Sequence, residues 1–299
     1  MPVVEEPFRI LAWNVNHRIR QKPMPDAYAK GILSLKPDVV VLTEYVEGPD
    51  HASFCTALRT GGLDYQCHTK FEPRHNHVLI ASWTPFTIGT LVPPNRLPHA
   101  VSNWLHVRLT DPSLELVGLR VPIERPTENR SYWDWFELAI QRLLASPAVI
   151  IGDLNADPRL PTRLGTDHLK RLKQAGWKLP DPEGAWSYNS NQGQTSRLDH
   201  ALISPSVTLN KAEYIPSLDN YSFASPEGNP SDHTPLVLDI SLQRQAPKRD
   251  HYRDPIEKAR WREINVVVHD PADQDTESDA TQDRRSSIPS RNTAEPVSS

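Results

Sequence analysis

Polar side chains that could do catalytic chemistry stand at the ends of five strand-like stretches of this 299-residue sequence. Three stretches carry them at the C-terminal end, namely Asn14 and Asn16 in WNVN, Glu44 in VVVLTE, and Asp153 and Asn155 in VIIGDLN. Two carry them at the start, namely Asp199 in SRLDHALIS and Asp232 with His233 in PSDHTPLVL. If the last two strands run antiparallel to the first three, all five groups meet at one edge of the molecule.

Four carboxylates, Glu44, Asp153, Asp199 and Asp232, would then share one site, where like charges repel one another and raise pKa values. A bound divalent cation removes this conflict. The donors are oxygens without a thiolate, which favours Mg²⁺ or Mn²⁺ over Zn²⁺. Because Mg²⁺ usually takes one or two carboxylates with waters and phosphate oxygens, we predict Glu44 and Asp232 as ligands, with Asn16 nearby.

The elements that must position these groups follow from apolar periodicity. Strands are expected at 8–16, 38–44, 77–82, 104–110, 114–121, 148–155, 198–204 and 234–241. Helices are expected within 25–38, 131–147 and 165–177, the first ending before Pro37 and the second at Pro147. The last two have Ser131 and Thr166 as N-caps. Many strands with few helices between them favour two packed sheets with helices outside.

Composition limits the organisation of the chain. We predict a catalytic domain over 1–243, a docked C-terminal extension over 244–268, and a disordered tail over 269–299, which is nearly free of apolar residues. The net charge of −4 does not suggest a tight, non-specific nucleic-acid binder. Cys55 and Cys67 are too few for a disulfide scaffold and indicate reduced thiols. With no apolar run of membrane-spanning length and an acidic start, the expectation is a cytoplasmic monomer.

Five motifs, WNVN, LTE, GDLNADP, SRLDHALIS and SDHTPLVL, occur in this order between residues 8 and 241. Each is weak alone, but together they resemble the endonuclease/exonuclease/phosphatase family. The resemblance implies an α/β fold, a four-layered sandwich of two packed mixed β-sheets flanked by helices. It also implies metal-dependent hydrolysis of phosphate esters.

The resemblance implies a role for each residue of the cation site. Glu44 is similar to the principal metal ligand of the family. Asn14 and Asn16 help to hold metal and phosphate, so Asn14 also binds substrate. Asp232 matches the acidic residue before the family's histidine and supports the metal site.

It likewise implies the residues of the reaction itself. Asp153 resembles the group that positions and deprotonates the attacking water, and Asn155 the amide that orients this water and the phosphate. His233 resembles the histidine on the scissile phosphate, with Asp199 orienting its ring. Phosphoryl transfer requires such positioning and charge neutralisation more than covalent chemistry. Gly152 is expected to let the phosphate approach the backbone.

One position departs from the family pattern. In LELVGLRVPIERP, Arg120 stands where members usually offer a His or Tyr to the phosphate. Arg can grip phosphate with two N–H groups but cannot act as a general acid at neutral pH. The alternative is a strand Arg that points to solvent. The residues after Pro122 also lack the amide of some nuclease relatives, which argues against an abasic-site or pancreatic-type nuclease.

Three further signals bear on the site. Trp186 and Tyr188, in the loop before SRLDH, are predicted to contact substrate because function concentrates in loops. The aromatic run SYWDWF is predicted to be core rather than a platform for bases. The cluster CHTKFEPRHNH matches no closed tetrahedral zinc pattern.

The leading prediction is a Mg²⁺-dependent phosphodiester hydrolase, most simply a nuclease, with nucleic acid or another phosphodiester as substrate. A phosphatase or phosphodiesterase for a small molecule or lipid headgroup is the alternative, favoured by the non-basic composition. A non-catalytic binding module on the same fold is favoured by Arg120 alone.

Overall fold

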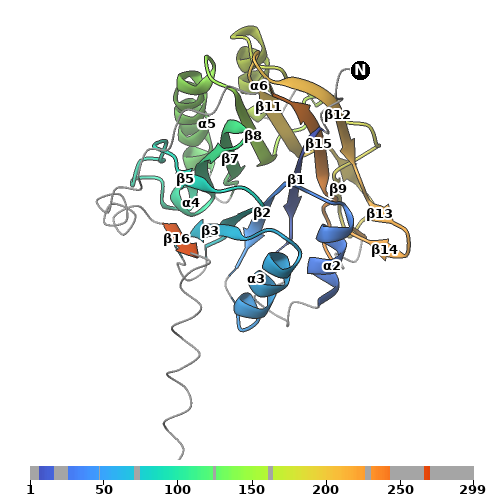
Figure 1. The fold of residues 1–299 in the computed structure, drawn as a ribbon. Coiled ribbons are helices and arrows are strands. Elements are labelled where there is room, and N and C mark those ends of the chain that lie inside the picture. Colours follow the sequence, from blue (N-terminus) through green and yellow to red (C-terminus); the bar gives the residue numbers. More distant parts are fainter. Residues whose placement is uncertain are drawn as a thin grey trace, which may run out of the picture.

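The computed structural model describes residues 7–16, 26–46, 48–70, 75–123, 126–160, 164–225, 230–242 and 266–269, which form two large packed β-sheets (Figure 1). The larger sheet contains, in spatial order, β12 (Thr208–Tyr214), β15 (Leu236–Ser241), β1 (Phe8–Asn14), β2 (Val39–Tyr45), β4 (His77–Ser82), β3 (Tyr65–Thr69) and β16 (Val266–His269). The smaller contains β11 (Asp199–Ile203), β8 (Ala148–Asp153), β7 (Ser113–Arg120), β6 (Trp104–Thr110) and β5 (Phe86–Ile88). Two short pairs are β9 (Tyr188–Asn189) with β10 (Thr195–Ser196), and β13 (Ser217–Leu218) with β14 (Tyr221–Ser222).

Helices cover the outer face of each sheet (Figure 1). On the larger sheet lie α2 (Asp26–Ser34) and α3 (His51–Thr60), and on the smaller lie α5 (Pro126–Ile140) and α6 (Leu164–Gln174). The short helix α4 (Pro98–Ser102) and the 3-10 turn η1 (Gln141–Leu143) complete the helical set of the described residues. The order helix, sheet, sheet, helix confirms the predicted four-layered α/β sandwich.

The apolar core between the sheets is built from alternate residues of the central strands. Ile10 and Ala12 of β1 and Ile151 of β8 are buried in it. Side chains two apart on a strand share a face. Asn14 and Asp153, the next positions of the same alternation, therefore continue this inner face where the apolar core ends.

The strand directions bring the polar ends together. Strand β1 is parallel to β2, and β7 is parallel to β8. Strand β15 runs antiparallel to β1, and β11 runs antiparallel to β8. The predicted antiparallel direction of the last two strands is therefore observed, and β11 and β15 begin where the parallel strands end.

Two predicted helix starts are wrong. Ser131 lies inside α5, which begins at Pro126; proline is favoured in a first helical turn because its missing N–H has no partner there. Thr166 lies inside α6, which begins at Leu164. Its hydroxyl donates to the carbonyl of Leu160 over 2.9 Å instead of capping a helix N–H.

The aromatic run of α5 and the two cysteines lie in the interior of the protein. Tyr132, Trp133 and Phe136 are fully buried under the smaller sheet, so the aromatic run is core. Cys55 and Cys67 are both buried thiols rather than partners in a disulfide. No helix in the described ranges is both long and apolar enough to span a membrane.

The C-terminal region is described only at β16, which pairs antiparallel with β3 at the sheet edge, Val266 opposite Thr69. The remainder of 244–299 lies outside the described residues. The boundaries 1–243, 244–268 and 269–299 stay predictions.

Gly152 is required by the neighbouring strand. Its φ is 145°, and an added Cβ would lie 2.0 Å from the carbonyl oxygen of Leu119 on β7. The sequence interpretation assigned this glycine to phosphate approach, whereas the close contact in the structure is with the strand beside it.

We predict that Gly152→Ala lowers the free energy of unfolding by roughly 2 to 4 kcal/mol, from backbone strain and overpacking together. Urea unfolding measures the loss. Gly193→Ala is the matched control, because Gly193 also has a positive φ of 74° but no atom within 4 Å of the added Cβ. An equal loss in the two variants would contradict the packing explanation.

Asp157 connects the loop after β8 to the residues just before β11 through hydrogen bonds. Its carboxylate accepts the backbone N–H groups of Arg159 and Arg197, each over 3.0 Å, and pairs with the Arg159 guanidinium at 2.7 Å. Burial raises the pKa of Asp157, but these donors outweigh it and hold the pKa well below its usual value.

A lowered carboxyl pKa contributes stability above the unfolded pKa of about 3.9, and this contribution is lost as the pH falls toward the folded pKa. Asp157→Asn should therefore lower the free energy of unfolding by about 1 to 3 kcal/mol at pH 7. The difference in this free energy between variant and wild type should become smaller below about pH 4. Chemical denaturation at a series of pH values measures the difference. In the control Asp167→Asn, which removes an exposed carboxylate, the change should stay under about 0.5 kcal/mol.

Candidate active site

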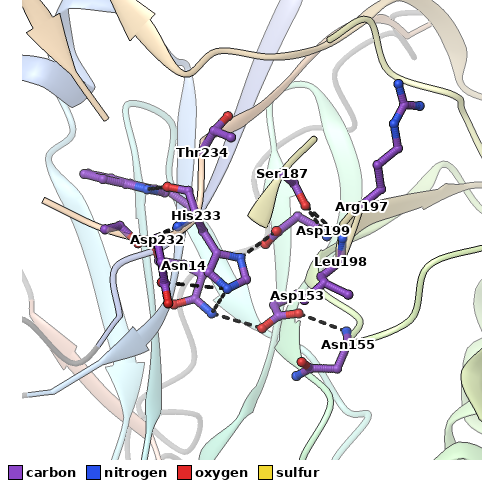
Figure 2. Close-up of polar contacts among 12 residues, drawn as sticks. Asn14, Asp153, Asn155, Ser187, Arg197, Leu198, Asp199, Asp232, His233 and Thr234 are labelled. Carbon is purple, nitrogen blue, oxygen red and sulfur yellow. Dashed lines mark hydrogen bonds and ion pairs between the residues drawn. The ribbon is translucent and has the colours of Figure 1, made fainter. Parts of the chain in front are cut away.

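Three polar contacts join the two sheets at the edge where the strand ends meet, and Figure 2 shows those of His233 with Asp199 and of Asn14 with Asp153. Asp199 at the start of β11 accepts a hydrogen bond from His233, just before β15, with 2.7 Å between Oδ2 and Nδ1. Asn14 of β1 donates from Nδ2 to Asp153 Oδ2 of β8 over 2.9 Å. The same Nδ2 lies 3.5 Å from His233 Nε2. Asn14 therefore stands between the acid and the histidine.

The third contact is an ion pair between Arg120 and Glu44. Arg120 Nε lies 2.7 Å from Glu44 Oε1 and 3.8 Å from Asp153 Oδ2. The side chains of Arg120 and Glu44 are only 8% and 11% exposed. The solvent-facing alternative for Arg120 is therefore wrong, and its cation lies within the carboxylate cluster.

Local backbone geometry directs Glu44 into this cluster. Leu42 and Tyr45 both pack in the outer core under the helices, with a register shift of the strand pairing between them. Glu44 has a φ of 50°, which is rare for a residue with a Cβ. A bulge with one left-handed residue re-aims a side chain, and here it turns Glu44 to the inner face.

The pKa values of Asp153 and His233 are both raised, although burial alone acts on the two groups in opposite directions. Burial and the charge of Asp199 raise the pKa of Asp153 to about 7, against the lowering effect of His233 and Arg120. Burial lowers the pKa of His233, but the hydrogen bond and charge of Asp199, with the charge of Asp153, raise it to about 10. His233 is therefore a cation at neutral pH, and Asp153 is poised to exchange a proton.

Asp232 lies at the solvent-exposed side of the cluster. Its side chain is 26% exposed, and its Oδ1 lies 4.0 Å from His233 Nε2. Burial raises its pKa. Within the described residues, Oδ1 is buried and accepts no hydrogen bond. This oxygen is suited to a cation or a bound water.

Asn16 and Asn155 occupy turns that extend the site. Both have left-handed backbones, with φ values of 53° and 48°. The N–H of Asn16 donates to Asn14 Oδ1, and the N–H of Asn155 donates to Asp153 Oδ1, each over 2.9 Å. The Asn155 side-chain nitrogen donates to the carbonyl of Val121. In the structure both turns fix the orientation of the neighbouring site residue.

Of the two predicted substrate-contact residues, one reaches the histidine. The ring of Tyr188 is half-buried, with its centroid 4.9 Å from that of His233. Trp186 is also half-buried, but no polar or ring contact joins it to the site side chains in the described part of the chain. His200, next to Asp199, points to the opposite face of β11, with Nε2 2.7 Å from the carbonyl of Arg197.

Two supporting serines were missed by sequence reasoning. Ser187 Oγ accepts the N–H groups of Leu198 and Asp199, and Ser231 Oγ donates to the Asn14 carbonyl and accepts the His233 N–H. Both are fully buried. Ser231 stands within the motif SDHTPLVL and could have been noticed there, whereas Ser187 has no sequence signal beyond its nearness to Tyr188.

The donor chemistry fits a hard divalent cation held by few protein ligands. Glu44 and Asp232 supply carboxylate oxygens, and Asp232 Oδ1 lacks a hydrogen-bond donor among the described residues. Over the same ranges no group of three or more His, Cys, Asp or Glu side chains is arranged so that it could hold a metal ion. Mg²⁺ needs no such cage, because it commonly keeps waters and takes phosphate oxygens.

Solved structures share this fold. An AP endonuclease from Archaeoglobus fulgidus matches with a TM-score of 0.59 and 18% identity, over 79% of this chain and all of that one. The 3'-5' exonuclease NExo from Neisseria meningitidis matches with the same TM-score, identity and coverage. A variant of NExo from Neisseria, described as a 3' phosphatase bound to product DNA hairpin, matches with a TM-score of 0.57 and 18% identity over the same shares.

Sequence comparison gives a family but no individual relative. No curated protein sequence matches the chain. The model of the Endonuclease/Exonuclease/phosphatase family matches residues 11–233, which include every residue placed in the site above. The match covers well over half of the chain, and the layered fold agrees with it. The chain therefore belongs to the endonuclease/exonuclease/phosphatase family.

Proposed function

We propose that the protein is a divalent-cation-dependent phosphodiester hydrolase, most simply a nuclease. The observation that carries this proposal is the buried array in which Asn14 Nδ2 donates to Asp153 and lies 3.5 Å from Nε2 of His233, the partner of Asp199. In this proposal Asp153 is the proton acceptor, Asn14 the amide donor and His233 the cationic donor, and all three side chains lie close together. Such an arrangement suits attack of water on a phosphate ester.

Each residue of the array has a role in the proposed reaction. Asp153 takes the proton from the attacking water, and its carboxylate is held by Asn14 and by the Asn155 N–H. His233 presents its Nε2–H to a phosphate oxygen, because Nδ1 is held by Asp199. Asn155 aligns Asp153, while Tyr188 packs against the ring of His233.

In this proposal Glu44 and Asp232, with Asn16 near them, hold Mg²⁺ or Mn²⁺. When bound, the cation neutralises phosphate oxygens and supplies Lewis acidity. Arg120 is the second positive group for the phosphate. As the oxygen of the attacking water bonds to phosphorus, the bond from phosphorus to the leaving oxygen breaks. Solvent water supplies the proton to that oxygen, because Arg120 keeps its proton at neutral pH.

The substrate class rests on the fold neighbours. The AP endonuclease and the exonuclease are named for action on DNA, and one neighbour is described with product DNA. The net charge of −4 favours the second candidate, a phosphatase or phosphodiesterase for a small molecule or lipid headgroup. Salt separates the two, because cleavage of nucleic acid weakens steeply as salt rises. A cytoplasmic, monomeric enzyme remains part of the proposal.

Asp153→Asn should lower kcat roughly 100-fold to 10,000-fold, because the proton acceptor is lost while its size is retained. The assay uses Mg²⁺ or Mn²⁺ with single- and double-stranded DNA, RNA and a bis-aryl phosphodiester. Asp134→Asn, an exposed change on α5, is the control and should retain full activity. Hydrolysis at an unchanged rate in Asp153→Asn would refute the assigned base.

Removal of the cation should abolish hydrolysis, and Mg²⁺ should raise the melting temperature of the wild type. A ligand at 100 times its Kd stabilises the folded state by about 2.7 kcal/mol. Glu44→Gln should lose this thermal shift, whereas Glu115→Gln, at an ion pair elsewhere on the smaller sheet, should keep it. An equal shift in Glu44→Gln would show that the cation binds at other residues.

A further inference from the structure

We propose that Arg120 and a divalent cation compete for Glu44, and that substrate phosphate resolves the competition by drawing the guanidinium to itself. The inference rests on the proposed function, because it specifies how that site takes up its cation. It makes binding of the cation and binding of the phosphate mutually dependent through one side chain of this chain.

The first observation is that Arg120 is built into the site. It ends β7 directly opposite Asp153 in the parallel register, and its N–H donates to the carbonyl of Asn103 over 3.0 Å. Two residues earlier, Gly118 faces the inner core, where an added Cβ would lie 2.5 Å from Val41. The alternation along β7 therefore directs Arg120 between the sheets, where 6% of the residue is exposed.

The second observation is the contact with Glu44. The 2.7 Å ion pair occupies Oε1 of the carboxylate proposed as the principal cation ligand. A guanidinium stays charged at any pH that a folded protein tolerates, so loss of a proton cannot relieve the pair. A divalent cation on Glu44 would then lie beside a fixed positive charge in a poorly solvated site, which weakens its binding.

The third observation is the balance of charge. The described site holds four carboxylates, Glu44, Asp153, Asp199 and Asp232, against the two cations Arg120 and His233. With all carboxylates ionised the cluster retains negative charge, so it still attracts a divalent cation despite Arg120. Adding the cation to the resting site leaves Arg120 without its partner at Glu44.

An incoming phosphate supplies the missing anion. Guanidinium binds phosphate through two parallel N–H groups, a geometry that suits phosphate as well as carboxylate. With Arg120 on the phosphate, the carboxylate of Glu44 would be released to hold the cation, which would supply further positive charge for the phosphate. Binding of each ligand therefore strengthens binding of the other, and this coupling is reciprocal.

The test measures Mg²⁺ binding to the full chain by titration calorimetry, with and without inorganic phosphate, in wild type, Arg120→Met and Arg120→Gln. Without phosphate, both variants should bind Mg²⁺ roughly 5-fold to 150-fold more tightly than wild type, the usual range of such coupling. Phosphate should tighten Mg²⁺ binding more in wild type than in either variant. The Gln variant retains a donor for Glu44, so it provides a folded neutral variant if Met does not.

Three controls define the result. Arg108→Met removes an Arg–Glu pair on β6 and should leave Mg²⁺ affinity unchanged. Arg120→Lys retains the charge and should restore weak binding. Glu44→Gln combined with Arg120→Met should abolish the tight binding that Arg120→Met alone produces.

Unchanged or weaker Mg²⁺ binding in both neutral variants would overturn the inference, as would Mg²⁺ binding to none of the proteins. No step of this test depends on turnover. A protein that binds Mg²⁺ as expected but hydrolyses no phosphodiester would refute the proposed function and leave the competition at Glu44 established.

Discussion

The concentration of negative charge at one end of the sandwich is the constraint on which the rest of the site depends. Asp153, Asp199, Asp232 and Glu44 lie where the apolar core between the sheets ends. Carboxylates can lie so close together only when nearby cations and hydrogen-bond donors offset their mutual repulsion. His233, Arg120 and the Asn14 amide supply that compensation, and each is held by further contacts. The chemistry of the site is thus inseparable from its charge balance.

Much of the fold and part of the site could be predicted from sequence, for a definite reason. Alternation is local, so Asn14 and Asp153 could be placed on the inner face from the residues before them. The predicted helix starts at Ser131 and Thr166 were wrong, because several residues near each helix end are suited to a first turn and the sequence alone does not choose between them. The strand directions could be stated only as a condition, since they depend on pairing between distant parts of the chain.

The parts that could not be predicted depend on tertiary contacts. Plain alternation would turn Glu44 toward the outer helices, and only the bulge and left-handed backbone reverse this. The inward direction of the Arg120 side chain depends on the pairing of β7 with β8, which the sequence around Arg120 does not reveal. Ser187 is important only because β11 and β15 begin beside it. The roles of the site residues remain proposals that rest on this geometry.

The division of the site between the sheets has a mechanical consequence. Asn14, Glu44 and His233 belong to the larger sheet, whereas Asp153, Asp199 and Arg120 belong to the smaller. A small slide of one layer across the other would stretch all three bridges at once. Interior methyl groups of the core between the sheets, such as those of Ile151 and Val41, therefore set the alignment of the site side chains. Loosening them could slow turnover in a protein that is still folded.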